Sequence, residues 1–237
     1  MIQTHKAIVL SSLKYGEADL IVKCYTEIGL KSYMLKGILK QKKGRIASAY
    51  FLPLSQLELT ANYPPQKQLF FIKEVGVAYP YQRIATDIVK QTIVVFLSEV
   101  LSSALKEEEA NPSLFSYIET ALQWLDTHEQ TSNFHLLFLM NLTRHLGFYP
   151  EFSGSMTYFD LVEGKFTNHF VSKHYISGEQ LGYFKAILGT NFDALASVKF
   201  NKKSRQELLE ILIEYFELHL SGFKKPKSLA VLKTIFS

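Results

Sequence analysis

The sequence predicts an α+β protein in which a small five-stranded β-barrel is followed by an α-helical domain. Two patterns lead to this prediction. Short apolar runs with a two-residue period, separated by turn residues, fill residues 1–80, and apolar residues at helical spacing take over after Pro80. We therefore expect a barrel domain over residues 1–80 and a helical domain over residues 81–237, with an irregular insert near residues 148–176.

Five segments of the first 80 residues have the pattern of β-strands: THKAIVLSSLKY, EADLIVKCYTE, LKSYMLKGI, SQLELTA and QLFFIKEVGVA. In the second segment, Leu20, Val22 and Cys24 share one face. In the fourth, Leu57 and Leu59 are expected to face inward. The turn signals between the segments are Tyr15-Gly16, Ile28-Gly29, Lys43-Gly44 and Tyr63-Pro64-Pro65. Five short strands can close into a barrel without exposed edges, and the OB-fold is the usual build of a barrel this small.

Helices are expected from residue 81 onward. No Gly or Pro interrupts the apolar spacing from Tyr81 to Lys106, which predicts one long helix. Asn111-Pro112 is typical of an N-cap followed by proline at the first helical position, and a third helix is expected from about Ser132 to Leu146.

The last third of the chain combines a short hairpin with further helices. The hairpin is expected within MTYFDLVEGKFTNHF, with its turn at Glu163-Gly164. Two capping boxes, Ser177 with Gln180 and Ser204 with Glu207, predict the starts of two later helices.

The composition is that of a packed globular protein, with 47% apolar and 20% charged residues. The single cysteine, Cys24, rules out an internal disulfide and a cysteine-based zinc site. The N-terminus lacks the apolar core of a signal peptide, and the apolar run from Ile93 to Leu97 is too short to span a bilayer. These features favour a cytoplasmic protein.

No catalytic or cofactor motif is evident, so we expect neither an enzyme nor a cofactor. The sequence holds no P-loop, dinucleotide fingerprint, GxSxG elbow or HExxH motif. His169 and His174 could share a metal ion, but no further ligand has matching spacing, which favours a surface or loop role.

Positive charge is concentrated in the predicted barrel. Residues 1–80 hold eleven Lys and Arg against five Asp and Glu, whereas the remainder has a net charge of −2. The segment KGILKQKKGR, residues 36–45, joins two predicted strands and carries five cations and no acid, which favours phosphate binding. The residues predicted to bind DNA are Lys14, Lys36, Lys40, Lys42, Lys43, Arg45 and, as a base-stacking platform, Tyr33. Alternatively, the loop only keeps the protein soluble and the aromatic residues belong to the core.

A second group of cations lies near the C-terminus. Its members are Lys202, Lys203, Arg205, Lys224, Lys225 and Lys227. They could contact DNA or an acidic, aromatic-tipped peptide, whereas the last three could instead complement a helix dipole.

An ordered set of short motifs resembles the N-terminal part of the bacterial RecO family of DNA repair proteins. The motifs are Leu13 with Tyr15-Gly16-Glu17 and Asp19, then Tyr25-Thr26-Glu27 before Gly29, then Lys36-Gly37 with the basic segment, and YFLPLSQLEL at residues 50–59. Farther along, LGFYP at residues 146–150 is weaker support.

The resemblance implies an OB-fold, a helical domain and a non-enzymatic role in the RecFOR pathway. Members bind single- and double-stranded DNA, anneal complementary strands and help to load the RecA recombinase onto DNA coated by single-stranded DNA-binding protein. The implied partners are RecR, the acidic C-terminal tail of that coating protein and, in some cases, RecF. The implied location is the bacterial nucleoid.

One departure from the family concerns zinc. Many members carry a four-cysteine zinc module after a segment like LGFYP, but Glu151 to His174 contains no cysteine here. We expect no zinc, with aromatic packing through Phe152, Tyr158, Phe159 and Phe166 in its place. Two other classes remain open: an RNA-binding barrel protein, and an adaptor that binds acidic proteins.

Overall fold

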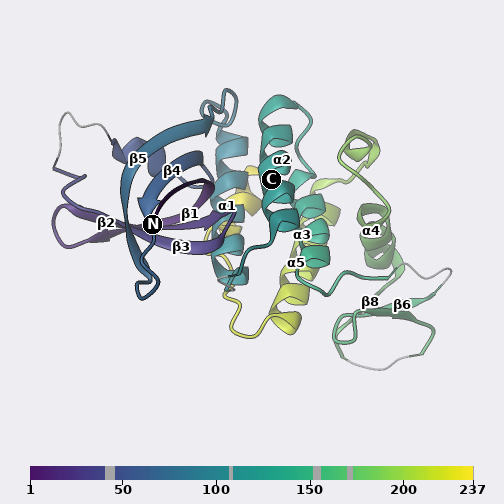
Figure 1. The fold of residues 1–237 in the computed structure, drawn as a ribbon. Coiled ribbons are helices and arrows are strands. Elements are labelled where there is room, and N and C mark those ends of the chain that lie inside the picture. The colour runs from purple at the N-terminus through teal and green to yellow at the C-terminus, as the bar shows by residue number, and fades with distance from the viewer. Residues whose placement is uncertain (41–45, 107–108, 152–155, 170–172, 237) are drawn as a thin grey trace. The chain divides into compact units, whose positions relative to one another are not determined.

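The computed structural model describes residues 1–40, 46–106, 109–151, 156–169 and 173–236 (Figure 1). The chain forms two compact units. The first holds Met1–Asp126 with Pro226–Ser228, and the second holds Thr127–Lys225 with Leu229–Ser237. This division places the first helix with the barrel, and the domain boundary expected at residue 80 stays a prediction. None of the helices within the described residues is long and apolar enough to cross a membrane.

The N-terminal unit contains the predicted barrel, closed in the strand order β1-β2-β3-β5-β4. Its strands are β1 (Ile2–Tyr15), β2 (Asp19–Thr26), β3 (Gly29–Leu35), β4 (Gln56–Asn62) and β5 (Leu69–Tyr79). A short 3-10 helix, η1 (Ser48–Phe51), precedes β4. Only β3 and β5 pair in parallel; the other pairs are antiparallel. The five-stranded barrel expected from the turn spacing is confirmed.

The barrel core confirms the inward faces predicted from the alternation. Val22, Cys24, Leu57 and Leu59 are all buried in one apolar cluster. Burial raises the pKa of the Cys24 thiol, because the thiolate would lose its hydration there. Cys24 is therefore a neutral core residue.

The first helix, α1 (Ile88–Ala104), begins seven residues later than the sequence predicts. The carboxylate of Asp126 accepts hydrogen bonds from the backbone N–H groups of residues 82–84, at 3.0, 2.9 and 2.8 Å. Asp87 then caps the helix by accepting from the backbone N–H groups of Val89 and Lys90. The segment before Ile88 thus pairs its backbone with a distant carboxylate instead of forming a helical turn.

The second helix, α2 (Pro112–Thr127), begins where predicted. The Oδ1 atom of Asn111 accepts a hydrogen bond from the backbone N–H of Leu114 at 3.0 Å. The N-cap with proline at the first helical position is confirmed.

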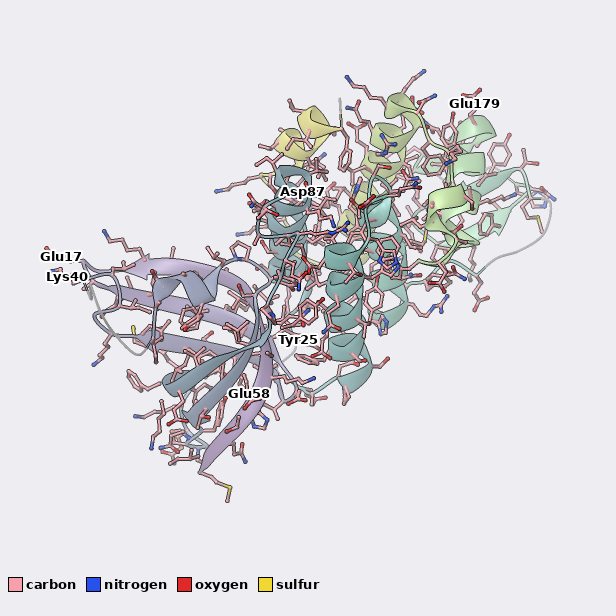
Figure 2. The ribbon with its side chains drawn as sticks, turned by 90° about the horizontal axis from the view of Figure 1, so that it is seen from above. Glu17, Tyr25, Lys40, Glu58, Asp87 and Glu179 are labelled. Carbon is pink, nitrogen blue, oxygen red and sulfur yellow. The ribbon has the colours of Figure 1, made fainter. Side chains whose placement is uncertain are left out.

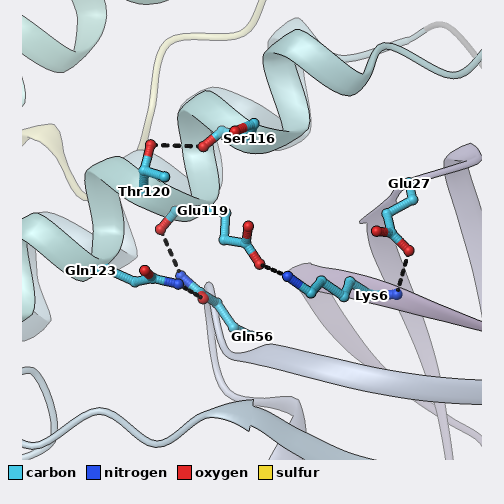
Figure 3. Close-up of polar contacts among 7 residues, drawn as sticks. All are labelled: Lys6, Glu27, Gln56, Ser116, Glu119, Thr120 and Gln123. Atoms are coloured by element: carbon cyan, nitrogen blue, oxygen red, sulfur yellow. Dashed lines mark hydrogen bonds and ion pairs between the residues drawn. The ribbon is translucent and has the colours of Figure 1, made fainter.

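Polar contacts join the barrel to α2 within the same unit (Figure 3). Lys6 on β1 forms an ion pair with Glu119 on α2 at 2.9 Å, and Glu119 raises the pKa of the Lys6 amino group. Gln56 on β4 donates to the Glu119 carbonyl oxygen and accepts from the Gln123 amide, both at 3.0 Å. The charge of Lys6 therefore serves the packing of α2 on the barrel.

Within the residues that the structure describes, the second unit combines four helices with a small sheet. The helices are α3 (Phe134–His145), α4 (Gly178–Leu188), α5 (Lys202–His219) and α6 (Leu229–Ile235), and a 3-10 helix, η2 (Leu195–Ser197), precedes α5. The sheet has the order β7-β6-β8, from β6 (Tyr158–Asp160), β7 (Lys165–Thr167) and β8 (Tyr175–Ser177). The predicted hairpin is confirmed as β6 and β7, with Gly164 at a φ of 67° in its turn.

The two capping predictions in this unit have different outcomes. Ser177 is the N-cap of α4, although its side chain makes no capping hydrogen bond. The prediction for Ser204 is wrong, because α5 starts at Lys202 and its N-cap is Asn201. The Asn201 side chain accepts from the backbone N–H of Ser204 at 2.8 Å, so Ser204 lies in the first turn.

Aromatic side chains form much of the packing around the small sheet. Phe159 on β6 contacts Phe166 and Phe184, with ring centroids 4.8 and 4.6 Å apart. Tyr158 makes an edge contact with Tyr175. The packing expected for Phe159, Phe166 and Tyr158 is present, and Phe152 lies outside the described residues.

Candidate nucleic-acid interface

The basic segment of residues 36–45, here called the barrel loop, leaves β3 through an anchored root, residues 36–40. The backbone N–H of Gly37 donates to the Asp19 carboxylate at 2.7 Å, and that of Leu39 donates to the Ala18 carbonyl at 2.9 Å. Gly37 adopts a φ of 69°, which favours glycine. The β1–β2 turn therefore fixes the direction in which the loop starts. The remaining cations of the loop, Lys42, Lys43 and Arg45, lie outside the described residues.

An ion pair adds to this anchor. The amino group of Lys40 lies 2.8 Å from the Glu17 carboxylate, and both side chains are largely exposed (Figure 2). Such a pair is weak in water and is screened by salt, so an incoming phosphate can replace Glu17 at Lys40.

Lys36 and Phe71 form a contact that the sequence analysis missed. The Lys36 amino group lies 5.4 Å from the centre of the Phe71 ring, on the strand β5. Phe71 is 46% exposed, whereas its neighbour Phe70 is in the barrel core. The adjacent pair Phe70-Phe71 was the available signal, because successive residues of a strand face opposite sides and only one can point inward.

Lys14 and Lys23 place further charge on the barrel. Lys14 is exposed on β1, opposite Leu20 in the β1–β2 pairing. Partial burial lowers the pKa of Lys23 on β2, because desolvation disfavours its charged form.

The prediction that Tyr33 stacks on bases is wrong, because its side chain is fully buried in the barrel core. Its hydroxyl lies 2.8 Å from that of Tyr63, and burial raises its pKa. Tyr25 and Phe51 are also buried, and Tyr50 packs against the core, so the core interpretation holds for these aromatic residues.

The C-terminal cations differ in their surroundings. Lys202 and Lys203 are exposed at the start of α5, and Lys203 lies 3.7 Å from Glu207. Arg205 instead donates to the Asn133 side chain and to the Phe200 carbonyl, each at 3.1 Å. Its guanidinium is thus part of the helical packing.

Lys224, Lys225 and Lys227 are exposed beyond the end of α5 at His219. They lie outside its last turn, where the dipole effect is confined. The chain is held next to them, since the backbone N–H and hydroxyl of Ser228 both donate to the Glu99 carboxylate at 2.9 Å.

In the described part of the chain, the two candidate metal ligands, His169 and His174, are not joined by further residues that could complete a metal site. His174 pairs through Nδ1 with Glu214 at 2.7 Å, and His169 is exposed. No group of three or more His, Cys, Asp or Glu suited to a metal ion occurs among the described residues.

Comparison with known proteins gives consistent matches over the whole chain. The family model "Recombination protein O N terminal" matches residues 1–81, and "Recombination protein O C terminal" matches residues 85–230. The chain is 47% identical to the DNA repair protein RecO of Christiangramia forsetii over 233 residues, which cover 98% of each protein. It is 44% identical to that of Flavobacterium psychrophilum over 235 residues, again 98% of each protein. It is 37% identical to that of Bacteroides fragilis over an alignment of 241 positions that covers both proteins completely.

Proposed function

This chain belongs to the RecO family of DNA repair proteins, and from that premise we propose that it is a non-enzymatic recombination mediator. In this proposal it binds single- and double-stranded DNA, anneals complementary strands and helps to load the RecA recombinase onto DNA coated by single-stranded DNA-binding protein.

The observation that carries the proposal is the anchored root of the barrel loop. Asp19 and Ala18 hold the backbone at Gly37 and Leu39, so Lys36 and Lys40 start from a fixed position on the barrel. Phosphates bound there release counterions, which gives affinity without sequence preference. The residues proposed to contact DNA are Lys14, Lys36, Lys40, Lys42, Lys43 and Arg45.

Annealing needs no covalent step. Two single strands repel each other through their phosphates, and a cationic loop that binds one strand lowers this repulsion toward a second. The bases then pair by themselves. A basic barrel is therefore sufficient for this step, and the proposal assigns no catalytic residue.

Protein partners are proposed on the same premise. They are RecR, the acidic tail of the single-stranded DNA-binding protein and, in some settings, RecF. The exposed cations Lys202, Lys203, Lys224, Lys225 and Lys227 are the candidates for the acidic tail, because Arg205 is engaged by Asn133 and Phe200.

The test is fluorescence anisotropy with labelled single-stranded DNA over a salt series. The wild type is compared with a variant in which Lys40, Lys42, Lys43 and Arg45 are changed to Ala. Each lost phosphate contact is expected to reduce the salt slope by about 0.7, so the variant loses both affinity and slope.

A charge-matched control changes four exposed lysines elsewhere, Lys67, Lys106, Lys165 and Lys173, to Ala. If both variants lose the same slope, general charge and not the barrel loop drives binding. Absence of binding by the wild type at moderate salt contradicts the proposal, and stronger binding to RNA of the same sequence supports an RNA-binding protein instead.

A further inference from the structure

Four apolar side chains form a continuous row across the outside of the barrel. Directly opposed residues of neighbouring strands point to the same side of a sheet. The opposed pairs are Leu13 with Ile21, Ile21 with Met34, and Met34 with Phe71, on strands β1, β2, β3 and β5. We call these four residues the outer strip. At about 4.8 Å between strands, the strip is about 14 Å long.

The inner residues next to the strip show that it faces outward. Val22, Tyr33 and Phe70, each adjacent to a member of the strip, all lie in the barrel core. Since successive residues of a strand face opposite sides, Ile21, Met34 and Phe71 point away from the core.

The strip is accessible at both ends. Leu13 is 66% exposed and Phe71 is 46% exposed. Met34, in the middle of the strip, is only 9% exposed, although it is absent from the core cluster. The solvent face of such a sheet is ordinarily polar, and a contiguous apolar row marks a binding surface.

The charge beside the strip restricts what can bind. The Lys36 amino group lies over the Phe71 ring, and Lys23 lies two residues along β2 from Ile21 on the same face. The nearest acid in the other direction, Asp19, is bound to the backbone N–H of Gly37. A suitable ligand therefore has flat apolar faces together with negative charge, as single-stranded nucleic acid has.

We propose that the outer strip is a base-binding platform for single-stranded DNA, with Phe71 as the stacking residue and Lys36 holding an adjoining phosphate. This inference rests on the proposed DNA binding and deepens it. The cations of the barrel loop serve both forms of DNA, whereas the strip serves single strands alone, because bases inside a duplex are already stacked and paired.

The test uses Phe71→Ala, with Phe71→Tyr to retain a stacking ring. Val77→Ala is the matched control, since Val77 lies on the same strand and is 47% exposed. Three probes of about 16 nucleotides are compared by anisotropy: an oligothymidylate, an abasic strand with the same phosphates, and a duplex. Equal thermal melting of all variants shows that the fold is intact.

The expected result is an about 5- to 150-fold loss of affinity of Phe71→Ala for the oligothymidylate, as for one lost base stack. Its affinities for the abasic strand and the duplex should stay within about twofold of the wild type, and Phe71→Tyr and Val77→Ala should bind all probes normally.

Other outcomes overturn the inference in distinguishable ways. If Phe71→Ala binds the oligothymidylate normally while loss of the loop cations abolishes binding, the strip is not a base platform but the proposed function stands. An equal loss for all three probes shows that Phe71 only supports the charged surface. If the wild type binds none of the probes, the inference and the proposed function both fail, and the strip is left to a protein partner.

Discussion

Lys40 at the root of the barrel loop and Arg205 on α5 are both cations in basic stretches of sequence, but their surroundings differ. Lys40 has one exposed carboxylate partner, Glu17. Arg205 donates two hydrogen bonds to groups of its own unit and lies 5.5 Å from the ring of Phe236. A cation with an exposed partner can exchange it for a ligand, whereas a cation built into the packing stabilises the fold.

The largest expected effect is a loss of folding stability at low pH, and it arises at His135, a buried neighbour of Arg205. His135 is fully buried on α3 and stacks on Phe236. Burial and, to a lesser extent, the Arg205 charge lower its pKa from 6.5 to about 3. On acidification, the unfolded chain therefore takes up a proton at His135 before the folded chain does. The contribution of neutral His135 to the free energy of unfolding is complete above pH 6.5, and it is lost as the pH falls from 6.5 toward 3. The loss is about 3 kcal/mol at pH 4.

Thermal unfolding at pH 7, 5.5 and 4 measures this loss. His135→Leu is the comparison, since the variant lacks the titrating group but keeps its carboxylates. A decline in melting temperature that is equally steep in both proteins would show that His135 contributes nothing to acid sensitivity.

The next effect separates Arg205 from its exposed neighbour. Arg205→Ala leaves the Asn133 and Phe200 acceptors without this donor, and we expect it to destabilise the fold by about 2 kcal/mol. Lys203→Ala removes only an exposed pair with Glu207 and should cost at most about 0.5 kcal/mol. Chemical denaturation gives both values, and similar costs for the two variants would show that Arg205 contributes no more to stability than the exposed Lys203.

The smallest effect lies at the barrel loop. Glu17→Gln removes the carboxylate that competes with phosphate for Lys40, so affinity for single-stranded DNA should rise about two- to threefold at low salt. The increase should vanish near 0.5 M salt, where exposed pairs are screened. Glu58→Gln is the control, with the same charge change on the exposed part of β4. Equal gains for both variants would mean that only the net charge matters.

The helix starts show which local signals were sufficient. The sequence identifies Asn111 as an N-cap because all parts of the motif lie within four residues: the Asn111 side chain that accepts, Pro112 at the first helical position and the Leu114 backbone N–H that donates. The start of α1 was placed too early, because Asp126 lies about forty residues from the segment whose backbone it binds. At α5 two polar residues three apart, Asn201 and Ser204, both fit the capping pattern, and only the backbone geometry distinguishes them.

The candidate site shows the same limit. The basic segment was evident from composition, and so was the motif that contains Gly16, Glu17 and Asp19. What the motif does is visible only in the fold, where the β1–β2 turn binds the root of the barrel loop. Tyr33 was assigned to the surface and Phe71 was overlooked for one reason, namely that both faces of β3 and β5 carry apolar residues.

The sequence by itself determined the five strands of the barrel, the hairpin of β6 and β7, the helices α2 and α3, the location of the positive charge and the membership of the family, but it did not predict β8 or α6. Alternation, helical spacing and turn residues are local properties, and each can be read within about ten residues. Tertiary structure decided which aromatic residues point outward and which cations are available. Alternation separates the two faces of a strand without saying which face is the inner one. The parallel pairing of β3 with β5 joins segments that are more than thirty residues apart in the sequence, and this pairing determines which face of each strand points into the barrel.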